Sequence, residues 1–270
     1  MQERFRSINT RVAAQRMKEY RSEIRRLTNQ DKRGYRWDYC DSSLSSFEES
    51  FAVLLPRGEK LKNYVEQSLA HRAGEAIGIE LGGPGSSLFS GFTHGFFKKT
   101  AGIALADQRR FFDYDPTDKD TMRNHTVIEG DILRRSTLRK IEQEFLQGEK
   151  ADFIIKRMVG GDFYLPCEPF FMGGRANDYY QMLSRSRGLM LVENPMAFWD
   201  LIDVWGLHSH HNNYGLEVDV RTNGSRGGVM LRKLADAPEE LPLLTVEEVR
   251  EIVGDKGKYS ALSALFATPS

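Results

Sequence analysis

The sequence has few cysteines, no net charge and no long apolar run. Its two cysteines, Cys40 and Cys167, form no metal-binding or redox spacing, which favours a reducing compartment. No apolar stretch approaches the roughly 20 residues that a membrane helix needs. The basic N-terminus lacks the apolar region of a secretory signal. We therefore expect a cytoplasmic protein that does not cross a membrane.

Positive charge is concentrated near the N-terminus, although the 38 Lys and Arg of the chain balance its 38 Asp and Glu. Residues 1–39 contain eleven Lys and Arg against five Asp and Glu, a local excess of six positive charges. Such a segment can bind nucleic acid, an acidic partner or the acidic remainder of its own protein. Two interpretations stay open: a solvated basic helix face, or a surface over residues 4–36 that binds RNA or another phosphate-bearing partner.

The first 73 residues are predicted to be helical and to lie outside the main sheet. A basic helix is expected over residues 11–27, where apolar residues recur at near-helical spacing. Ser46 and Glu49 resemble a capping box that begins a short helix ended by Pro56. A further helix is expected over about residues 59–72.

From residue 75 onward, predicted strands alternate with predicted helices. The five strand candidates are residues 76–81, 101–106, 126–129, 153–158 and 189–193. Helical patterns follow the third and fourth strands, at residues 136–147 and 177–187. Alternation of this kind favours a parallel sheet that carries helices on both faces.

The C-terminal part departs from this alternation. Apolar and charged residues alternate from Leu216 to Val220, Asn223-Gly224 is a turn signal, and the apolar residues of 229–234 follow, which together predict an antiparallel hairpin. The predicted fold is therefore α/β: a seven-stranded, mostly parallel, doubly wound sheet with a C-terminal antiparallel hairpin and an N-terminal helical extension. The expected divisions are a helical extension over 1–73, the sheet domain over 74–234 and a helical tail over 235–270.

The rest of the chain is organised around residues 75–91. The apolar run Ala76–Leu81 predicts a buried strand, which stops at a glycine-rich turn containing Gly82, Gly83 and Gly85. An apolar-rich helix pattern begins at Ser86. A strand, a glycine loop and a helix N-terminus together let the backbone approach a ligand closely with unpaired N–H groups. The stretch predicts a nucleotide-type cofactor.

This pattern resembles the class I S-adenosylmethionine-dependent methyltransferases over about residues 74–234, with a Rossmann-like fold. Glu80 and the glycines at 82, 83 and 85 resemble the family's first motif, which implies that they contact the methionine part of S-adenosylmethionine. The resemblance also implies roles for three further acids in the cofactor domain. Asp107 would bind the ribose hydroxyls, Asp131 would receive the adenine amino group, and Asp152 stands where an acid commonly opens the fourth strand.

A nicotinamide or flavin dehydrogenase is the rival interpretation within this fold, because Asp107 stands about where a dinucleotide fold places its ribose acid. The dinucleotide fingerprint requires a third glycine, and Leu88 occupies that position after Gly83 and Gly85. Glu80 would also place negative charge beside a pyrophosphate. Both features, with the terminal hairpin, favour the methyltransferase.

The resemblance implies that residues 157–171, after the fourth strand, face the methyl group. Asp162, Tyr164 and Glu168 are the candidate catalytic residues there. The segment lacks the Asn-Pro-Pro-Tyr pattern of amino-group methylation, and Pro166-Cys167 lies too far from the strand for the cytosine-C5 nucleophile. Methyl transfer needs little beyond alignment and a base, so the enzyme hypothesis stands, with RNA or a small metabolite as acceptor. The alternative is a non-catalytic methyltransferase-like protein that acts as a nucleic-acid-binding or assembly module.

Histidines offer no clear metal site in the sequence. His208, His210 and His211 are close in sequence, but adjacent loop histidines rarely bind one ion together, and no cysteine or carboxylate completes a known spacing. We expect them to line the substrate side. His94 and His125 are interpreted as surface residues or as core residues with satisfied hydrogen bonds.

Overall fold

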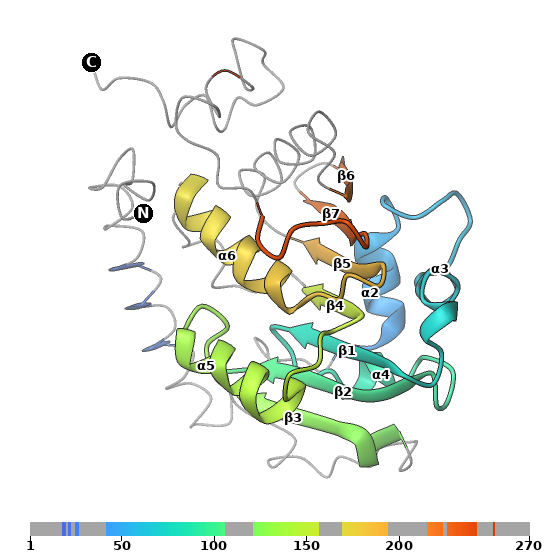
Figure 1. Ribbon diagram of the computed structural model, residues 1–270, viewed down its shortest axis with the longest axis horizontal. Helices are drawn as coiled ribbons and strands as arrows, with labels where there is room; N and C mark the ends of the chain where they lie inside the picture. The colour runs from blue at the N-terminus through green and yellow to red at the C-terminus, as the bar shows by residue number, and fades with distance from the viewer. Residues whose placement is uncertain are drawn as a thin grey trace.

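The computed structural model describes residues 18–19, 21–22, 25–26, 42–105, 121–156, 169–193, 215–223, 226–241 and 251, and is shown in Figure 1. The helices are α2 (Leu44–Phe51), α3 (Leu61–Ser68), α4 (Ser86–Phe89), α5 (Arg135–Lys140) and α6 (Pro169–Met182). The strands are β1 (Ala76–Leu81), β2 (Phe97–Ala104), β3 (His125–Glu129), β4 (Phe153–Lys156), β5 (Gly188–Glu193), β6 (Leu216–Asn223) and β7 (Arg226–Lys233).

The strands form a seven-stranded sheet in the order β3-β2-β1-β4-β5-β7-β6. The first five are parallel, whereas β7 runs antiparallel to both β5 and β6. Strands β1, β4 and β5 are buried along their whole length, which explains their nearly unbroken apolar sequences. The predicted fold class is confirmed, including the terminal hairpin, in which Leu216 faces Lys233 across the pair.

Helices cover both faces of the sheet (Figure 1). On one face, α5 and α6 pack on an aliphatic cluster that includes Ile79, Ile103 and Met190. On the other face, α2, α3 and α4 contribute to a cluster rich in phenylalanine, in which Phe47 and Phe51 join Phe153 of β4. Helices α2 and α3 lie outside the sheet, as expected, and their apolar residues pack in the same hydrophobic cluster as residues of β4 and β5.

Three helices begin or end away from their predicted positions. Helix α2 begins at Leu44, with Ser43 as its N-cap, so the capping box predicted at Ser46 is wrong. The helix pattern at Ser86 yields a single turn, which ends at Phe89 before the chain continues to β2. Helix α6 begins at Pro169 rather than at Asn177, since proline has a fixed φ and no N–H and so suits a first turn.

A buried lysine joins β7 to α6. Lys233 is fully buried, its Nζ donates to the Tyr180 carbonyl oxygen at 3.3 Å, and the same atom lies 4.0 Å from the centre of the Tyr180 ring. Burial lowers the pKa of Lys233 to about 8, and the nearby Glu239 carboxylate opposes that change. Burial also raises the pKa of Tyr180, whose hydroxyl donates to the Pro238 carbonyl at 2.8 Å. The segment after β7 is thereby fastened to α6.

The two ends of the chain contribute few described residues. Those at 18–19, 21–22 and 25–26 are helical, within the range predicted for the basic first helix, and Arg25 Nε donates to the Arg21 carbonyl at 3.1 Å. None of the helices in the described part of the chain is long and apolar enough to span a membrane.

Candidate functional site

The glycine loop after β1 turns the chain back over β2. Gly82 has φ of +104°, a value that side chains disfavour, and its N–H donates to the Ile103 carbonyl at 2.9 Å. Gly83 forms an antiparallel bridge with the same residue, and Gly85 has φ of +78° as it leads into α4. The loop therefore rests on the carboxyl-terminal half of β2.

The loop packs directly on the backbone of β2 at Gly102. A Cβ added to Gly102 would overlap the Pro84 carbonyl group and approach the Gly85 nitrogen to 2.7 Å. Both contacts are with backbone atoms, which cannot rotate away as a flexible side chain can. Glycine at position 102 therefore permits the close approach that the loop requires.

His125, at the start of β3, stabilises the glycine loop through a hydrogen bond to Pro84. Its Nε2 lies 2.8 Å from the Pro84 carbonyl oxygen, and its Nδ1 lies 2.8 Å from Thr100 Oγ1. A carbonyl accepts only, so Nε2 must carry the proton and donate. The Thr100 hydroxyl can donate to a neutral ring or accept from a charged one. The interpretation of His125 as a residue with satisfied hydrogen bonds agrees with this geometry.

Glu80 lies at the end of β1 beneath this loop and is only 2% exposed. It lies on the phenylalanine-rich face of the sheet, opposite Ile155 of β4 in the strand register. A Cβ added to Gly83 would overlap Glu80 Oε1. The absence of a side chain at Gly83 thus makes room for the carboxylate under the loop.

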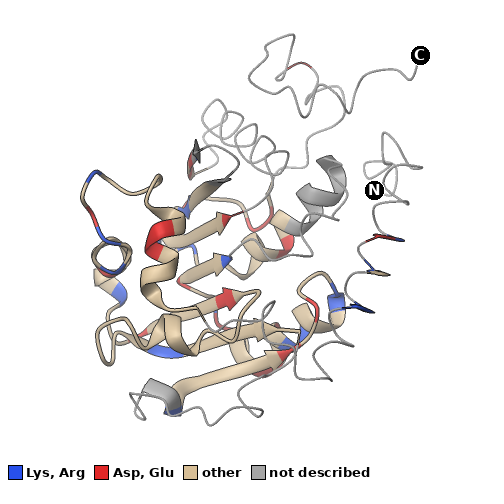
Figure 2. Ribbon diagram, turned by 180° about the vertical axis from the view of Figure 1, so that it is seen from behind, with Lys and Arg blue, Asp and Glu red and all other residues tan. Residues whose placement is uncertain are grey.

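Three adjacent strands end in buried charged residues at the same edge of the sheet. Glu80 of β1, Lys156 of β4 and Glu193 of β5 are 2%, 3% and 5% exposed. Figure 2 shows the alternation of acidic and basic residues at these strand tips. In the strand register, Glu80 and Glu193 lie on the phenylalanine-rich face, whereas Lys156 lies on the aliphatic face. Burying charge costs free energy unless polar partners surround it, so these residues mark a polar centre at the carboxyl edge of an otherwise apolar sheet.

This centre lies where the strand order changes direction, between β1 and β4, which pair with Leu81 facing Lys156. Ligands of open α/β sheets bind beyond the carboxyl ends of the strands at such a point. Lys156 was not among the site residues predicted from the sequence. Its burial at the centre of the sheet could be suspected from its place at the end of the apolar run 153–155.

Asp131 follows β3 at the same edge. Its Oδ1 accepts from the Leu133 N–H at 2.9 Å, and its Oδ2 lies 3.7 Å from Arg134 Nε. The carboxylate therefore stabilises the turn that leads to α5. This structural role explains an acid at this position without a ligand, and the adenine contact stays a prediction.

Asp152 lies at the opposite, amino-terminal edge of the sheet. It is 1% exposed, accepts from the Ile77 N–H at 3.0 Å and lies 3.3 Å from Arg72 Nε. These contacts join β4 to β1 and to the turn after α3. Asp152 is a structural residue remote from the carboxyl edge.

The remaining predicted site residues lie outside the described part of the chain: Asp107, Asp162, Tyr164, Glu168, His208, His210 and His211. The segment 157–171 was predicted to face the methyl group. Its last residues, Pro169–Phe171, begin α6, and its orientation toward the methyl group stays a prediction. Among the described residues, no group of three or more His, Cys, Asp or Glu could hold a metal ion.

Neither a protein-family model nor a curated protein matches this sequence. Among solved structures, it is similar to an rRNA methylase from Streptococcus thermophilus, with 12% identity, a TM-score of 0.41, and coverage of 66% of this chain and 99% of that one. It is also similar to the MycE methyltransferase of mycinamycin biosynthesis in complex with Mg and SAH, with 11% identity, a TM-score of 0.39, and coverage of 73% and 56%. A human methyltransferase 10 domain containing protein shows 12% identity, a TM-score of 0.40, and coverage of 72% and 94%. This chain spans little more than half the length of MycE.

Proposed function

We propose that this protein is an S-adenosylmethionine-dependent methyltransferase. The observation that carries the proposal is the buried Glu80 carboxylate beneath a fastened glycine loop, where the strand order reverses. The antiparallel pair β6–β7 that closes the sheet adds support, because the sequence resemblance expects such a hairpin.

The residues at the carboxyl edge fit such a cofactor. A carboxylate at Glu80 suits the cationic amino group of a methionine moiety, and Gly83 leaves room for this carboxylate under the loop. When bound, the cofactor supplies an activated methyl group, which passes to an acceptor atom and leaves S-adenosylhomocysteine. The protein aligns the acceptor and receives its proton. Asp107 and Asp131 are proposed for the ribose and adenine, and Asp162, Tyr164 and Glu168 as candidate proton acceptors.

The acceptor is proposed to be RNA or a small metabolite. The described residues of the basic N-terminal segment support RNA, because Lys18, Arg21, Arg25 and Arg26 are exposed. We place the reaction in the cytoplasm, in keeping with two cysteines that form no pairing or metal pattern.

Calorimetric titration of the purified protein tests the cofactor proposal. S-adenosylmethionine and S-adenosylhomocysteine should bind with micromolar affinity, and NAD should not bind. Glu80→Gln, which removes the charge at constant size, should weaken S-adenosylmethionine binding about tenfold or more. Glu75→Gln is the matched control, because Glu75 is exposed just before β1 at the opposite edge. Equal affinity in wild type and Glu80→Gln would contradict the site.

The second candidate is a non-catalytic methyltransferase-like protein that acts as a nucleic-acid-binding or assembly module. It is favoured by the absence of a catalytic signature in the sequence and by the basic pair Lys156-Arg157 where polar catalytic groups often occur. Its signature would be binding of S-adenosylmethionine without turnover on any RNA, together with RNA affinity that falls steeply with salt. Methyl transfer to RNA in a tritiated-methyl assay would exclude it.

A further inference from the structure

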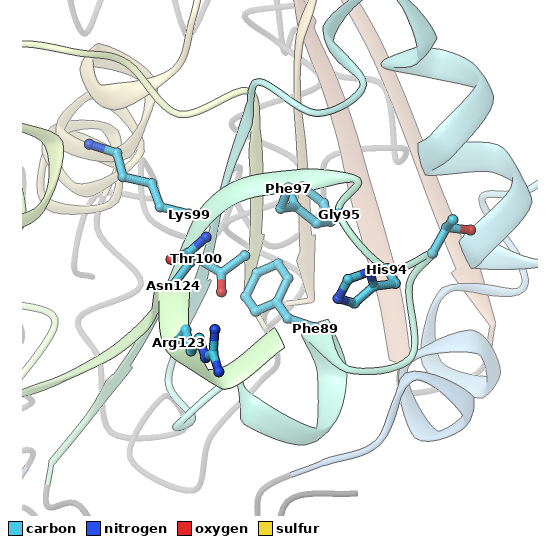
Figure 3. A pocket seen from close by; sticks show the side chains of 9 residues that line it. Phe89, His94, Gly95, Phe97, Lys99, Thr100, Arg123 and Asn124 are labelled. Atoms are coloured by element: carbon cyan, nitrogen blue, oxygen red, sulfur yellow. The ribbon is translucent and has the colours of Figure 1, made fainter. Parts of the chain in front are cut away.

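A pocket lies at the amino-terminal edge of the sheet, away from Glu80. It measures about 440 Å³, within the usual size range of small-molecule sites. Its walls come from the end of α4, the turn before β2, the start of β2 and the residues before β3. They include Phe89, His94, Phe97, Thr100, Arg123 and Asn124 (Figure 3).

One wall of the pocket is aromatic. The Phe89 and Phe97 rings meet edge to face, with their centres 5.3 Å apart, so their positions are fixed by packing. Phe89 is almost fully buried, whereas Phe97 is partly exposed. A partly exposed, immobilised ring offers a surface on which a flat apolar group can stack.

The polar part of the lining carries positive charge. Arg123 and His94 are exposed, and Figure 3 shows them on either side of the Phe89 ring. None of the described residues that line the pocket carries a carboxylate. Two acids act from outside: Glu66 accepts from the Thr93 N–H at 2.7 Å, and Glu149 Oε1 lies 2.7 Å from Lys99 Nζ.

Arg123 contributes a guanidinium to the exposed part of the lining. The Lys99 ammonium extends toward the π-helical turn Ile141–Leu146 that follows α5, where it donates to the Phe145 carbonyl at 2.9 Å. A guanidinium offers two parallel donors to a phosphate and remains charged at all accessible pH values. Asn124 adds an amide that can both donate and accept.

We propose that this pocket binds a small molecule that combines a phosphate with a flat ring, of the size of a nucleoside monophosphate. The phosphate binds Arg123, and the ring stacks on Phe97. Asn124 hydrogen-bonds the polar edge of the ring or the sugar. The source of the ligand is a free nucleotide or the 5′-phosphorylated end of an RNA.

This proposal does not depend on the methyltransferase proposal, because the two sites lie at opposite edges of the sheet. Two hydrogen bonds nevertheless connect the pocket to the glycine loop. Thr100 lines the pocket, its hydroxyl is hydrogen-bonded to His125 Nδ1, and His125 Nε2 donates to the Pro84 carbonyl oxygen.

Calorimetric titration with adenosine 5′-monophosphate tests the proposal, with adenosine and inorganic phosphate as partial ligands. We expect the monophosphate to bind wild type at least about tenfold more tightly than either part. Arg123→Ala should weaken it about tenfold or more, since a charge-assisted pair is lost, and Phe97→Leu should weaken monophosphate and adenosine alike. Arg57→Ala, which removes an exposed arginine between α2 and α3, should have no effect.

Two results would overturn the proposal: no binding of the monophosphate to wild type, or equal binding to wild type and Arg123→Ala. Binding that persists in Arg123→Ala but is lost in Glu80→Gln would place the nucleotide at the carboxyl edge instead, and also overturns it. Oligonucleotides with a 5′-phosphate or a 5′-hydroxyl then distinguish the sources. A preference for the phosphorylated oligonucleotide over the free nucleotide indicates an RNA end, and the reverse indicates a free nucleotide.

Discussion

Two acids are buried at opposite edges of the same pair of strands, and their surroundings differ. Asp152, before β4, binds the Ile77 N–H and lies beside Arg72, so its charge holds the amino ends of β1 and β4 together. Glu80, at the carboxyl end of β1, lies under the glycine loop, where the absence of a side chain at Gly83 makes room for its carboxylate. Both are at most 2% exposed.

The comparison shows that burial alone does not identify a functional acid. An acid that binds the backbone N–H of a neighbouring strand contributes to folding, whereas an acid placed under a glycine loop at a change in strand order is suited to a ligand. The amino edge should therefore respond to mutation mainly in stability, and the carboxyl edge mainly in binding.

Asp152→Ala should have the largest effect on stability. It removes the acceptor of a buried N–H and the partner of Arg72, so the free energy of unfolding should fall by about 3 kcal/mol or more. Urea denaturation followed by circular dichroism measures the change. Asp152→Asn keeps an acceptor for Ile77 and should recover part of the loss. If Asp152→Ala unfolded at the same urea concentration as wild type, Asp152 would not have the structural role assigned to it here.

Lys233→Met should change the pH dependence of stability. The pKa of Lys233 is lowered from 10.5 to about 8 by burial, so between these values the unfolded chain binds more protons than the folded one. Wild-type stability should therefore rise with pH from about 8, by up to roughly 2 kcal/mol near pH 9.5, before tyrosine ionisation in the unfolded chain opposes it. Lys233→Met should be more stable at neutral pH and lack the rise. Parallel profiles of the two proteins would disprove the assignment.

Gly102→Ala should disturb the glycine loop from below. The added methyl meets the Pro84 carbonyl group, and relief requires a backbone shift, so stability should fall by about 1–3 kcal/mol. S-adenosylmethionine binding per folded molecule should fall as well, which distinguishes this variant from Asp152→Ala. Thermal unfolding and calorimetry supply the two measurements. If Gly102→Ala bound S-adenosylmethionine as wild type does, the glycine loop would not be part of the proposed cofactor site.

His125→Gln should have the smallest effect, a loss of about 1 kcal/mol in the free energy of unfolding, because glutamine can keep one of the two hydrogen bonds of His125. Thr100→Val removes the other partner. Since the two residues share a hydrogen bond, the double variant should lose less stability than the sum of the single ones. Additive losses in a denaturation cycle would show that the Thr100–His125 contact contributes nothing.

The sheet could be predicted because its strands have distinctive patterns. The run Ala76–Leu81, apolar except for Glu80, indicated a buried strand, and the alternation after Leu216 indicated an antiparallel hairpin. The glycine loop and Glu80 were also found from the sequence, because few residue types can occupy these positions.

The remaining features depend on contacts distant in sequence. The glycine loop packs on Gly102, seventeen residues after Gly85 in the chain. His125 reaches Pro84, and Lys233 lies under Tyr180 of α6, and neither pairing has a local sequence pattern. The early start of α6 was missed because Gly173-Gly174 interrupts its helical periodicity.

The fastening of the glycine loop has a consequence for how tightly a ligand can bind. Flexible loops lose conformational entropy when a ligand orders them, and that loss reduces affinity. Here the Gly82 N–H, the Pro84 carbonyl and the packing on Gly102 hold the loop through contacts within the protein. Ordering of this loop should therefore subtract little from the affinity of a molecule that binds at it.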